Sequence, residues 1–248
     1  MSRTRLHTLE NPKSPVSEAF RTLRTNIQFS GIDKPINSLV ITSTGPGEGK
    51  STVSINIAVA MAQAEKNVLL IDCDLRKPSL HRTFTFNHLN GLTNILVEDM
   101  EYTDVLYEAE EIKGLHVIGS GPIPPNPAEL LGSNKMKNFV EKMKNIYDMV
   151  ILDAPPIGLV TDSAVLSTIV DGTILVCAVG EADINATKRA KELLDKVKAN
   201  ILGVVLSKVP INQGGYYRYH YSQYYDSSYY EYERTRKDNR RKKRGKAK

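Results

Sequence analysis

The amino-acid sequence predicts an α/β fold in which a mostly parallel sheet is covered by helices on both faces. Short aliphatic runs alternate with helical stretches along most of the chain, and these runs show no alternation of polar and apolar residues. Strands of this kind are typical of parallel sheets that are buried on both sides. The chain has 248 residues, of which 41% are hydrophobic, so it can form one large domain or two small ones.

The expected elements follow one another in a regular order. Residues 1–13 show no periodic pattern and are expected to be disordered. A helix is expected over residues 14–29, because Ser14 is a suitable N-cap and Pro15 suits a first helical turn. Strands are expected at residues 38–42, 67–72, 115–120, 148–153, 172–179 and 200–206, and further helices at residues 51–64 and 183–198.

The apolar pattern stops after Pro210. We therefore expect a folded domain over residues 14–210 and a flexible tail over residues 211–248. Residues 234–248 contain ten basic residues and one acidic residue, so they carry +9 while the rest of the chain carries −4. This basic segment is either simply solvated or attracted to an anionic lipid surface or an acidic partner, and nucleic acid is not the expected partner.

The two cysteines, Cys73 and Cys177, each lie inside an apolar run. We interpret them as small buried side chains and not as a disulfide or a metal pair, which fits a reducing cytosol. The first residues contain no apolar signal segment, and no apolar run approaches the roughly 18 residues that a membrane span needs. We therefore expect a cytoplasmic protein without a membrane-spanning segment.

The stretch "TSTGPGEGKST" at residues 42–52 joins an expected strand to an expected helix. Glycines let the backbone curl so that N–H groups point at phosphate oxygens, and the helix N-terminus adds a favourable dipole. Lys50 can reach the β- and γ-phosphates of ATP, and Ser51 can offer its hydroxyl to Mg²⁺. Thr44 stands where the usual pattern has glycine, and we expect Gly45 and Gly47 to supply the flexibility. The expected nucleotide-binding residues are Gly45, Pro46, Gly47, Glu48, Gly49, Lys50, Ser51 and Thr52.

Three acidic residues end two of the expected strands. Asp72 and Asp74 follow "VLLI", and Asp153 follows "MVIL". Residues two apart in an extended chain point the same way, and ligands of open α/β sheets bind at the carboxyl ends of strands. An acid at such a position can also merely cap the next helix. Three carboxylates beside a nucleoside triphosphate imply a cation between them, so we expect Mg²⁺.

These motifs together resemble the bacterial tyrosine kinases, which are P-loop NTPases related to the cell-division and plasmid-partition ATPases. The resemblance rests on the phosphate loop, "LLIDCDLRKP", "VILDAPP", "EAFRTLRTNI" at residues 18–27 and a tyrosine-rich tail, in that family's arrangement. It is strongest to the cytoplasmic kinase subunit of Gram-positive capsule and exopolysaccharide systems. The resemblance implies an ATP-dependent kinase that phosphorylates tyrosines of its own tail and regulates capsule production.

Catalytic roles for Lys50, Asp72, Asp74 and Asp153 follow from this reaction. A phenol with a pKa of about 10 is a poor nucleophile at neutral pH, so the reaction needs charge neutralisation and a proton acceptor. Lys50 and Mg²⁺ would neutralise the phosphate charge. Asp72 is the leading candidate for the base, while Asp74 and Asp153 would hold Mg²⁺ with Ser51; spacing alone leaves open which carboxylate does which. Arg76 either contacts a phosphate or forms a surface ion pair.

The tyrosines of the tail are the expected substrate. Nine of the chain's 12 tyrosines lie there, interleaved with polar residues that fix none of them in a core. An extended tail reaches a neighbouring copy more easily than its own site, which favours phosphorylation in trans. The expected phosphorylated residues are Tyr216, Tyr217, Tyr219, Tyr221, Tyr224, Tyr225, Tyr229, Tyr230 and Tyr232.

The resemblance also implies partners. Glu18, Arg21 and Arg24 match the segment with which the family builds rings, so we expect a homo-oligomer, an octamer by resemblance; pattern alone would equally allow a solvated helix face. A separate transmembrane activator would recruit the kinase to the membrane periphery. Protein substrates and a cognate tyrosine phosphatase complete the expected partners.

Two other functions remain open from the sequence. A partition- or division-type ATPase would act as an assembly switch, but those proteins carry an extra lysine five residues before the loop lysine, where this chain has Gly45. Such ATPases also have no reason to collect tyrosines in a tail. The second alternative is a scaffold in which ATP sets only the assembly state, and tyrosine labelling would distinguish it from a kinase.

Overall fold

The computed structural model describes residues 4–32, 34–86 and 89–210. Within it, the residues up to Lys208 form one compact unit, and residues 209 and 210 belong to a second unit. The tyrosine cluster and the basic tail expected after residue 210 lie outside the described residues. Within the described ranges, no helix combines the length and the apolar character that crossing a membrane requires.

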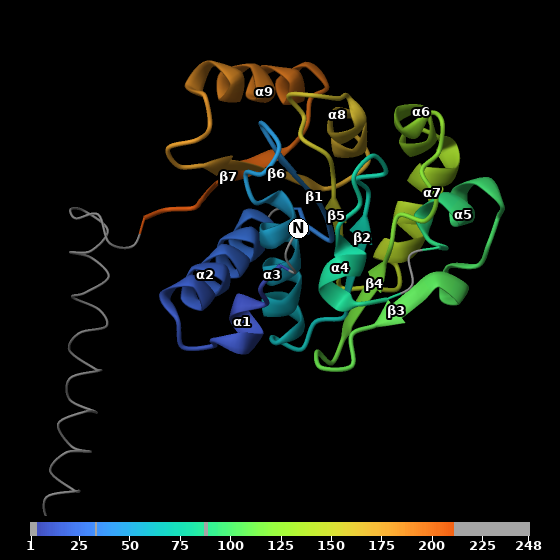
Figure 1. Ribbon diagram of the computed structural model, residues 1–248, viewed down its shortest axis with the longest axis horizontal. Coiled ribbons are helices and arrows are strands. Elements are labelled where there is room, and N and C mark those ends of the chain that lie inside the picture. The colour runs from blue at the N-terminus through green and yellow to red at the C-terminus, as the bar shows by residue number, and fades with distance from the viewer. Residues whose placement is uncertain (1–3, 33, 87–88, 211–248) are drawn as a thin grey trace, which may run out of the picture. The chain divides into compact units, whose positions relative to one another are not determined.

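A seven-stranded sheet forms the centre of the compact unit (Figure 1). The strand order is β3–β4–β2–β5–β1–β6–β7, and every neighbouring pair is parallel except β3 with β4. The mostly parallel sheet predicted from the sequence is therefore confirmed. The strands are β1 (Ser38–Ser43), β2 (Val68–Asp72), β3 (Leu106–Glu108), β4 (Leu115–Ile118), β5 (Met149–Asp153), β6 (Gly172–Ala178) and β7 (Ile201–Ser207).

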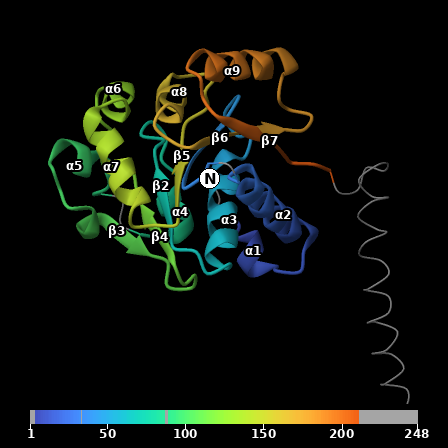
Figure 2. The ribbon, with the colours of Figure 1, turned by 180° about the vertical axis from the view of Figure 1, so that it is seen from behind.

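Helices cover both faces of this sheet (Figures 1 and 2). The buried side chains of α1 to α4 belong to one core cluster, and those of α5 to α9 belong to two clusters on the other face. The helices are α1 (His7–Glu10), α2 (Pro15–Ser30), α3 (Lys50–Ala62), α4 (Leu80–Phe84), α5 (Leu92–Val97), α6 (Pro127–Leu131), α7 (Asn134–Lys144), α8 (Asp162–Ser167) and α9 (Ile184–Lys196), with a 3₁₀ turn η1 (Tyr102–Val105).

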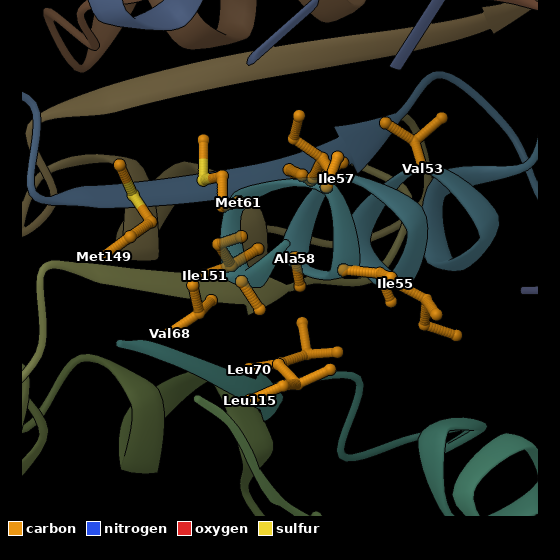
Figure 3. Close-up of a cluster of buried hydrophobic side chains, with 14 of the residues drawn as sticks. Val53, Ile55, Ile57, Ala58, Met61, Val68, Leu70, Leu115, Met149 and Ile151 are labelled. Atoms are coloured by element: carbon orange, nitrogen blue, oxygen red, sulfur yellow. The ribbon is translucent and has the colours of Figure 1, made fainter. Parts of the chain in front are cut away.

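The central helix α3 is apolar on almost every side. All residues from Val53 to Ala62 are buried, which is the pattern of a helix enclosed by the core. Side chains of α3 such as Ile55, Ala58 and Met61 share one core cluster with Val68 and Ile151 of the neighbouring strands (Figure 3). This packing fixes the position of α3, and therefore of Lys50 at its first residue, relative to the sheet.

The predicted cap of the helix α2 and the predicted burial of both cysteines are confirmed. The Ser14 hydroxyl accepts a hydrogen bond from the Ser17 amide and caps α2, and Pro15 occupies the first position of that helix. Cys73 and Cys177 are both buried free thiols, and burial raises the pKa of each.

The predicted disorder of residues 1–13 is wrong for residues 4–13. The helix α1 packs on the core, where Leu6 is only 3% exposed. The amide side chain of Asn56 holds the segment, because it donates to the Arg5 carbonyl and accepts from the Thr8 amide. A helix of four residues is too short to show periodicity in a sequence, so only its tertiary contacts reveal it.

The edge strand β3 was not predicted either. It has three residues, is only partly buried and runs antiparallel to β4. A strand of this length cannot be told from a loop by its pattern alone. Its antiparallel direction leaves the rest of the sheet parallel, so it does not alter the edge at which strands β1, β2 and β5 end.

Leu6→Ala tests the packing of the amino-terminal segment. We expect it to lower the free energy of unfolding by about 2–4 kcal/mol, because it removes buried methyl groups and leaves a cavity. Urea unfolding of the purified protein measures this change. Ile32→Ala is the matched control, since Ile32 is 75% exposed and its truncation should change stability by less than about 0.5 kcal/mol. Equal stability of the two variants would contradict the packing of α1.

Candidate active site

The loop between β1 and α3 has the backbone that a phosphate site requires. Gly47 and Gly49 have φ angles of 77° and 94°, in the region that favours glycine. Gly45 and Thr44 are not in that region, so the flexibility comes from Gly47 and Gly49 and not from Gly45. Thr44 is tolerated because its backbone needs no special conformation, and its hydroxyl instead contacts the hydroxyl of Thr187 at 3.3 Å.

The side chain of Glu48 folds back and closes this loop. Its carboxylate accepts hydrogen bonds from the backbone amides of Gly45, at 2.9 Å, and Thr44, at 3.3 Å. Glu48 is only 6% exposed, and burial raises the pKa of its carboxyl. The Ser207 hydroxyl, at the end of β7, donates to the Glu48 carbonyl oxygen at 2.5 Å. Ser207 therefore supports the loop backbone.

Lys50 brings the predicted catalytic residues together. Its ammonium lies 2.9 Å from the Asp74 carboxylate and 3.6 Å from the Asp153 carboxylate. Burial opposes the charge on Lys50, but the two carboxylates more than offset this and raise its pKa. The four residues Lys50, Asp72, Asp74 and Asp153 thus form one buried cluster at the carboxyl ends of β2 and β5.

Asp72 is positioned by strand register and by backbone donors. It pairs directly with Asp153 across the β2–β5 ladder. Its carboxylate accepts hydrogen bonds from the amides of Ser79, at 2.8 Å, and Leu80, at 3.0 Å. Complete burial and the nearby Asp153 charge nevertheless raise the pKa of Asp72 to about 7. A carboxyl that titrates near neutral pH can exchange a proton with a substrate.

One oxygen of the Asp153 carboxylate lacks a hydrogen-bond donor within the described part of the chain. Its Oδ1 atom accepts from the Ser54 hydroxyl at 3.1 Å, while Oδ2 is buried and has no hydrogen-bond donor among the described residues. Burial raises the pKa of Asp153 despite the nearby Lys50 ammonium. Ser54, one turn after Lys50, was missed by the sequence analysis, although a polar residue in an apolar helix was an available signal.

The donors present fit a hard divalent cation. Ser51 lies in the first turn of α3, and its hydroxyl accepts from Lys50 at 3.3 Å and from the Ser79 hydroxyl at 3.1 Å. The Ser51 hydroxyl, the Asp153 oxygen that accepts no hydrogen bond from the described residues and the carboxylate of Asp74 are oxygen ligands suited to Mg²⁺. In the described ranges no group of three or more His, Cys, Asp or Glu forms a metal cage. Nucleotide phosphates and water would therefore complete the coordination.

Arg76 forms an ion pair and does not point into this cluster. Its Nε and Nη2 atoms donate to the two oxygens of Asp162, at 2.9 and 3.1 Å. Asp162 is fully buried at the first position of α8, and the sequence analysis did not identify it. The pair ties the loop after β2 to the loop after β5, so both loops keep their position beside the cluster.

The three residues of the expected ring motif are engaged within the chain. Arg21 pairs with Glu18 at 2.8 Å and donates to the Pro12 carbonyl at 2.7 Å. Arg24 donates from Nη1 to the Ala60 carbonyl of α3 at 2.9 Å, and among the described residues its buried Nε has no acceptor. All three residues remain partly exposed, so each could also contact another copy.

The chain is similar to known proteins over most of its length. Residues 37–205 match the family described as an AAA domain. The putative tyrosine-protein kinase CapB of Staphylococcus aureus is 40% identical over 218 residues, which cover 88% of this chain and 95% of that protein. The tyrosine-protein kinase YwqD of Bacillus subtilis is 43% identical over 212 residues, which cover 86% of this chain and 89% of that protein.

A solved structure extends the similarity to three dimensions. The chimerical protein CapA2B2 superimposes with a TM-score of 0.80 and 40% sequence identity, over 84% of this chain and 93% of that one. The region that matches the AAA domain, residues 37–205, contains the phosphate loop and both acidic motifs. By sequence identity, coverage and fold, the chain belongs to the bacterial tyrosine kinase family.

Proposed function

We propose that this protein is an ATP-dependent protein-tyrosine kinase that phosphorylates the tyrosine cluster of its own tail, on a neighbouring copy. The observation that carries the proposal is the buried cluster of Lys50 and three carboxylates beside a phosphate loop, in a chain of this family. The nine tyrosines between Tyr216 and Tyr232 supply acceptors in the same chain.

The triphosphate of ATP binds along residues 45–52, with its γ-phosphate toward the Lys50 ammonium. The ammonium pairs with Asp74 at 2.9 Å, so bound ATP would compete with that carboxylate for it. Asp74 would hold Mg²⁺ together with Ser51 and Asp153. The bound cation supplies neutralisation of phosphate charge. Lys50 adds a second positive charge to the γ-phosphate in a buried site, where electrostatic stabilisation is stronger than in water.

Asp72 accepts the proton of the attacking phenol. Its carboxylate is oriented by the Ser79 and Leu80 amides, and its pKa of about 7 leaves it partly ionised at neutral pH. The bond from the phenol oxygen to the γ-phosphorus forms as the bond to ADP breaks, and the proton moves to Asp72. Repulsion between the negative charges of Asp72 and Asp153 makes protonation of one of them favourable.

Assembly brings the acceptor to the site. We place the kinase in the cytoplasm as a ring, an octamer by family resemblance, with Glu18, Arg21 and Arg24 at the contact between copies. Each phosphate adds about −1.5 to −2 charges, so several phosphates cancel the +9 of residues 234–248. Further phosphorylation then makes the tail negative, which repels neighbouring copies or releases the tail from an acidic surface. A separate transmembrane activator recruits the ring to the membrane, and a tyrosine phosphatase reverses the modification.

The biological role that fits this family is regulation of capsule or exopolysaccharide production. The relative in Staphylococcus aureus and the chimera with CapA carry names from that system. A hydrolytic assembly switch is the remaining alternative. Gly45 in place of the additional loop lysine and the tyrosine-rich tail both favour the kinase.

Lys50→Met tests the assignment of the site. We expect tyrosine phosphorylation to fall by about 10²-fold or more, because the variant loses the buried charge beside the γ-phosphate. Radiolabelled ATP and phosphoamino-acid analysis of the tail measure the change, with the variant purified free of wild type. Lys137→Met removes an exposed lysine on α7 and should leave labelling unchanged. Undiminished labelling of the Lys50→Met tail would show that the site is elsewhere.

The pH dependence of kcat/KM tests Asp72 as the base. Only the ionised carboxylate accepts a proton, so the rate should be constant above pH 7 and fall about tenfold per pH unit well below it. Initial rates of tail labelling at a series of pH values measure this decrease in rate at low pH. Asp72→Asn should lower the rate by about 10²-fold or more, and the remaining rate should no longer fall with pH below 7. An unchanged profile in that variant would assign the base to another group.

The combined change Arg21→Glu and Arg24→Glu tests the proposed ring contact. We expect smaller species on a sizing column, because the reversed charges repel the neighbouring copy. Circular dichroism checks that the fold survives loss of the Arg24 contact to α3. Lys137→Glu provides a matched charge reversal at an exposed position of α7. If the double variant is folded and elutes with the wild type, the motif lies outside the interface.

A further inference from the structure

A cavity of about 530 Å³ lies beside the phosphate loop, on the side that faces α9. Three segments that are far apart in the sequence form its walls: the phosphate loop, the connection between β5 and α8, and the region from the end of β6 through most of α9. Its lining includes Pro46, Glu48, Leu159, Glu181, Asp183, Ala186, Arg189 and Leu193. The proposed catalytic cluster of Lys50 and the carboxylates is not part of the lining.

The cavity exposes apolar side chains at its opening. Leu159 is 65% exposed and Leu193 is 39% exposed, although both are large aliphatic residues. Pro46 and Ala186 add further apolar surface to the walls. Exposed apolar groups around a concave surface are typical of sites that bind an apolar or aromatic partner. The volume is ample for one aromatic side chain.

Charged groups on the walls limit what can bind. Glu48, Glu181 and Asp183 contribute carboxylates, against the single guanidinium of Arg189. Asp183 also caps α9 by accepting from the Ala186 amide, and Glu181 pairs with Lys208, outside the cavity lining. An excess of carboxylates disfavours a phosphate group. The cavity therefore suits a neutral ring better than a phosphorylated one.

Arg189 is available to such a ring. Within the described ranges, no hydrogen bond or ion pair engages its guanidinium. A planar guanidinium can stack on the face of an aromatic ring or donate to a phenol oxygen. The cavity thus offers apolar walls for the body of a tyrosine and a donor for its polar end.

The cavity adjoins the first half of the phosphate loop. Glu48 lines the cavity and also closes the phosphate loop through the Gly45 amide. One residue of extended chain spans about 3.3 Å, so a segment that presents a tyrosine at the phosphate site has its next residues beside this cavity.

The acceptor segment has the spacing that this arrangement needs. Each of the nine tyrosines between Tyr216 and Tyr232 has another tyrosine one or two positions away. We propose that the cavity binds a second, unmodified tyrosine ring of the incoming segment of another copy, beside the tyrosine that receives the phosphoryl group. This inference rests on the proposed kinase function. It explains why tyrosines are clustered: each one serves as a docking ring until it is itself phosphorylated.

The test uses full-length chains as donor and acceptor. The donor keeps its site but carries serine at all nine tail tyrosines, so that it neither labels itself nor competes for docking. The acceptor carries Lys50→Met, so it cannot label itself, and it keeps Tyr225 as its only tail tyrosine. Position 224 carries Tyr224→Phe, Tyr224→Ser or Tyr224→Glu. The remaining seven tail tyrosines are replaced by serine. Label on Tyr225 is measured against acceptor concentration to obtain KM and kcat.

We expect the Tyr224→Phe acceptor to have a KM about tenfold lower than the Tyr224→Ser acceptor, because only phenylalanine supplies a ring. The Tyr224→Glu acceptor, which mimics a phosphorylated neighbour, should be no better than the serine acceptor. A preference for the glutamate acceptor would overturn the inference, since the cavity would then favour negative charge. Equal KM values for all three acceptors would overturn it as well.

Donor variants locate the effect in the cavity. Leu159→Asp and Leu193→Asp in the donor should abolish the preference for phenylalanine while the KM for ATP stays unchanged. Ile184→Asp is the matched control on α9, because Ile184 is exposed but does not line the cavity. If these leucine variants keep the preference, the ring docks elsewhere. A donor that keeps Leu159 and Leu193 should also label the tail of a Lys50→Met chain with all its tyrosines. If it labels neither that tail nor any of the acceptors, the proposed kinase function itself fails.

Discussion

The site depends on one interaction, the pairing of the Lys50 ammonium with the carboxylates of Asp74 and Asp153. Buried charges are costly unless they are paired, so this arrangement is stable only when all its members are in place. The pairing requires β2 and β5 to be adjacent and in register, and α3 to begin at the same edge of the sheet. A parallel sheet meets both requirements, because β1, β2 and β5 all end at that edge.

The three carboxylates differ in surroundings although they look alike in the sequence. Asp72 is held by backbone amides, Asp74 by the Lys50 ammonium, and Asp153 keeps a buried oxygen without a hydrogen-bond donor among the described residues. These differences suit each acid to a separate role in the proposed reaction: a proton acceptor near neutral pH for Asp72, a group that ATP would displace for Asp74, and a ligand for a cation for Asp153. Residues of the same type acquire different pKa values and different roles when their burial and hydrogen bonding differ.

The phosphate loop connects the catalytic cluster to the surface that would receive a substrate. Glu48 closes the loop through the Gly45 amide and lines the adjacent cavity, while Ser207 fixes the loop from the end of β7. Glu48 is therefore shared by the loop that would hold the phosphates and by the proposed docking cavity.

The sequence by itself determined the phosphate loop, the six longer strands and the acidic strand ends, because these depend on neighbouring residues and on short apolar runs. It failed for α1 and β3, whose few residues show no period. The Arg76–Asp162 pair, the support of the loop by Ser207 and the cavity between the loop and α9 were decided only by the tertiary structure. Each joins residues that are distant in the chain, and only the packing of helices on the sheet sets their separation.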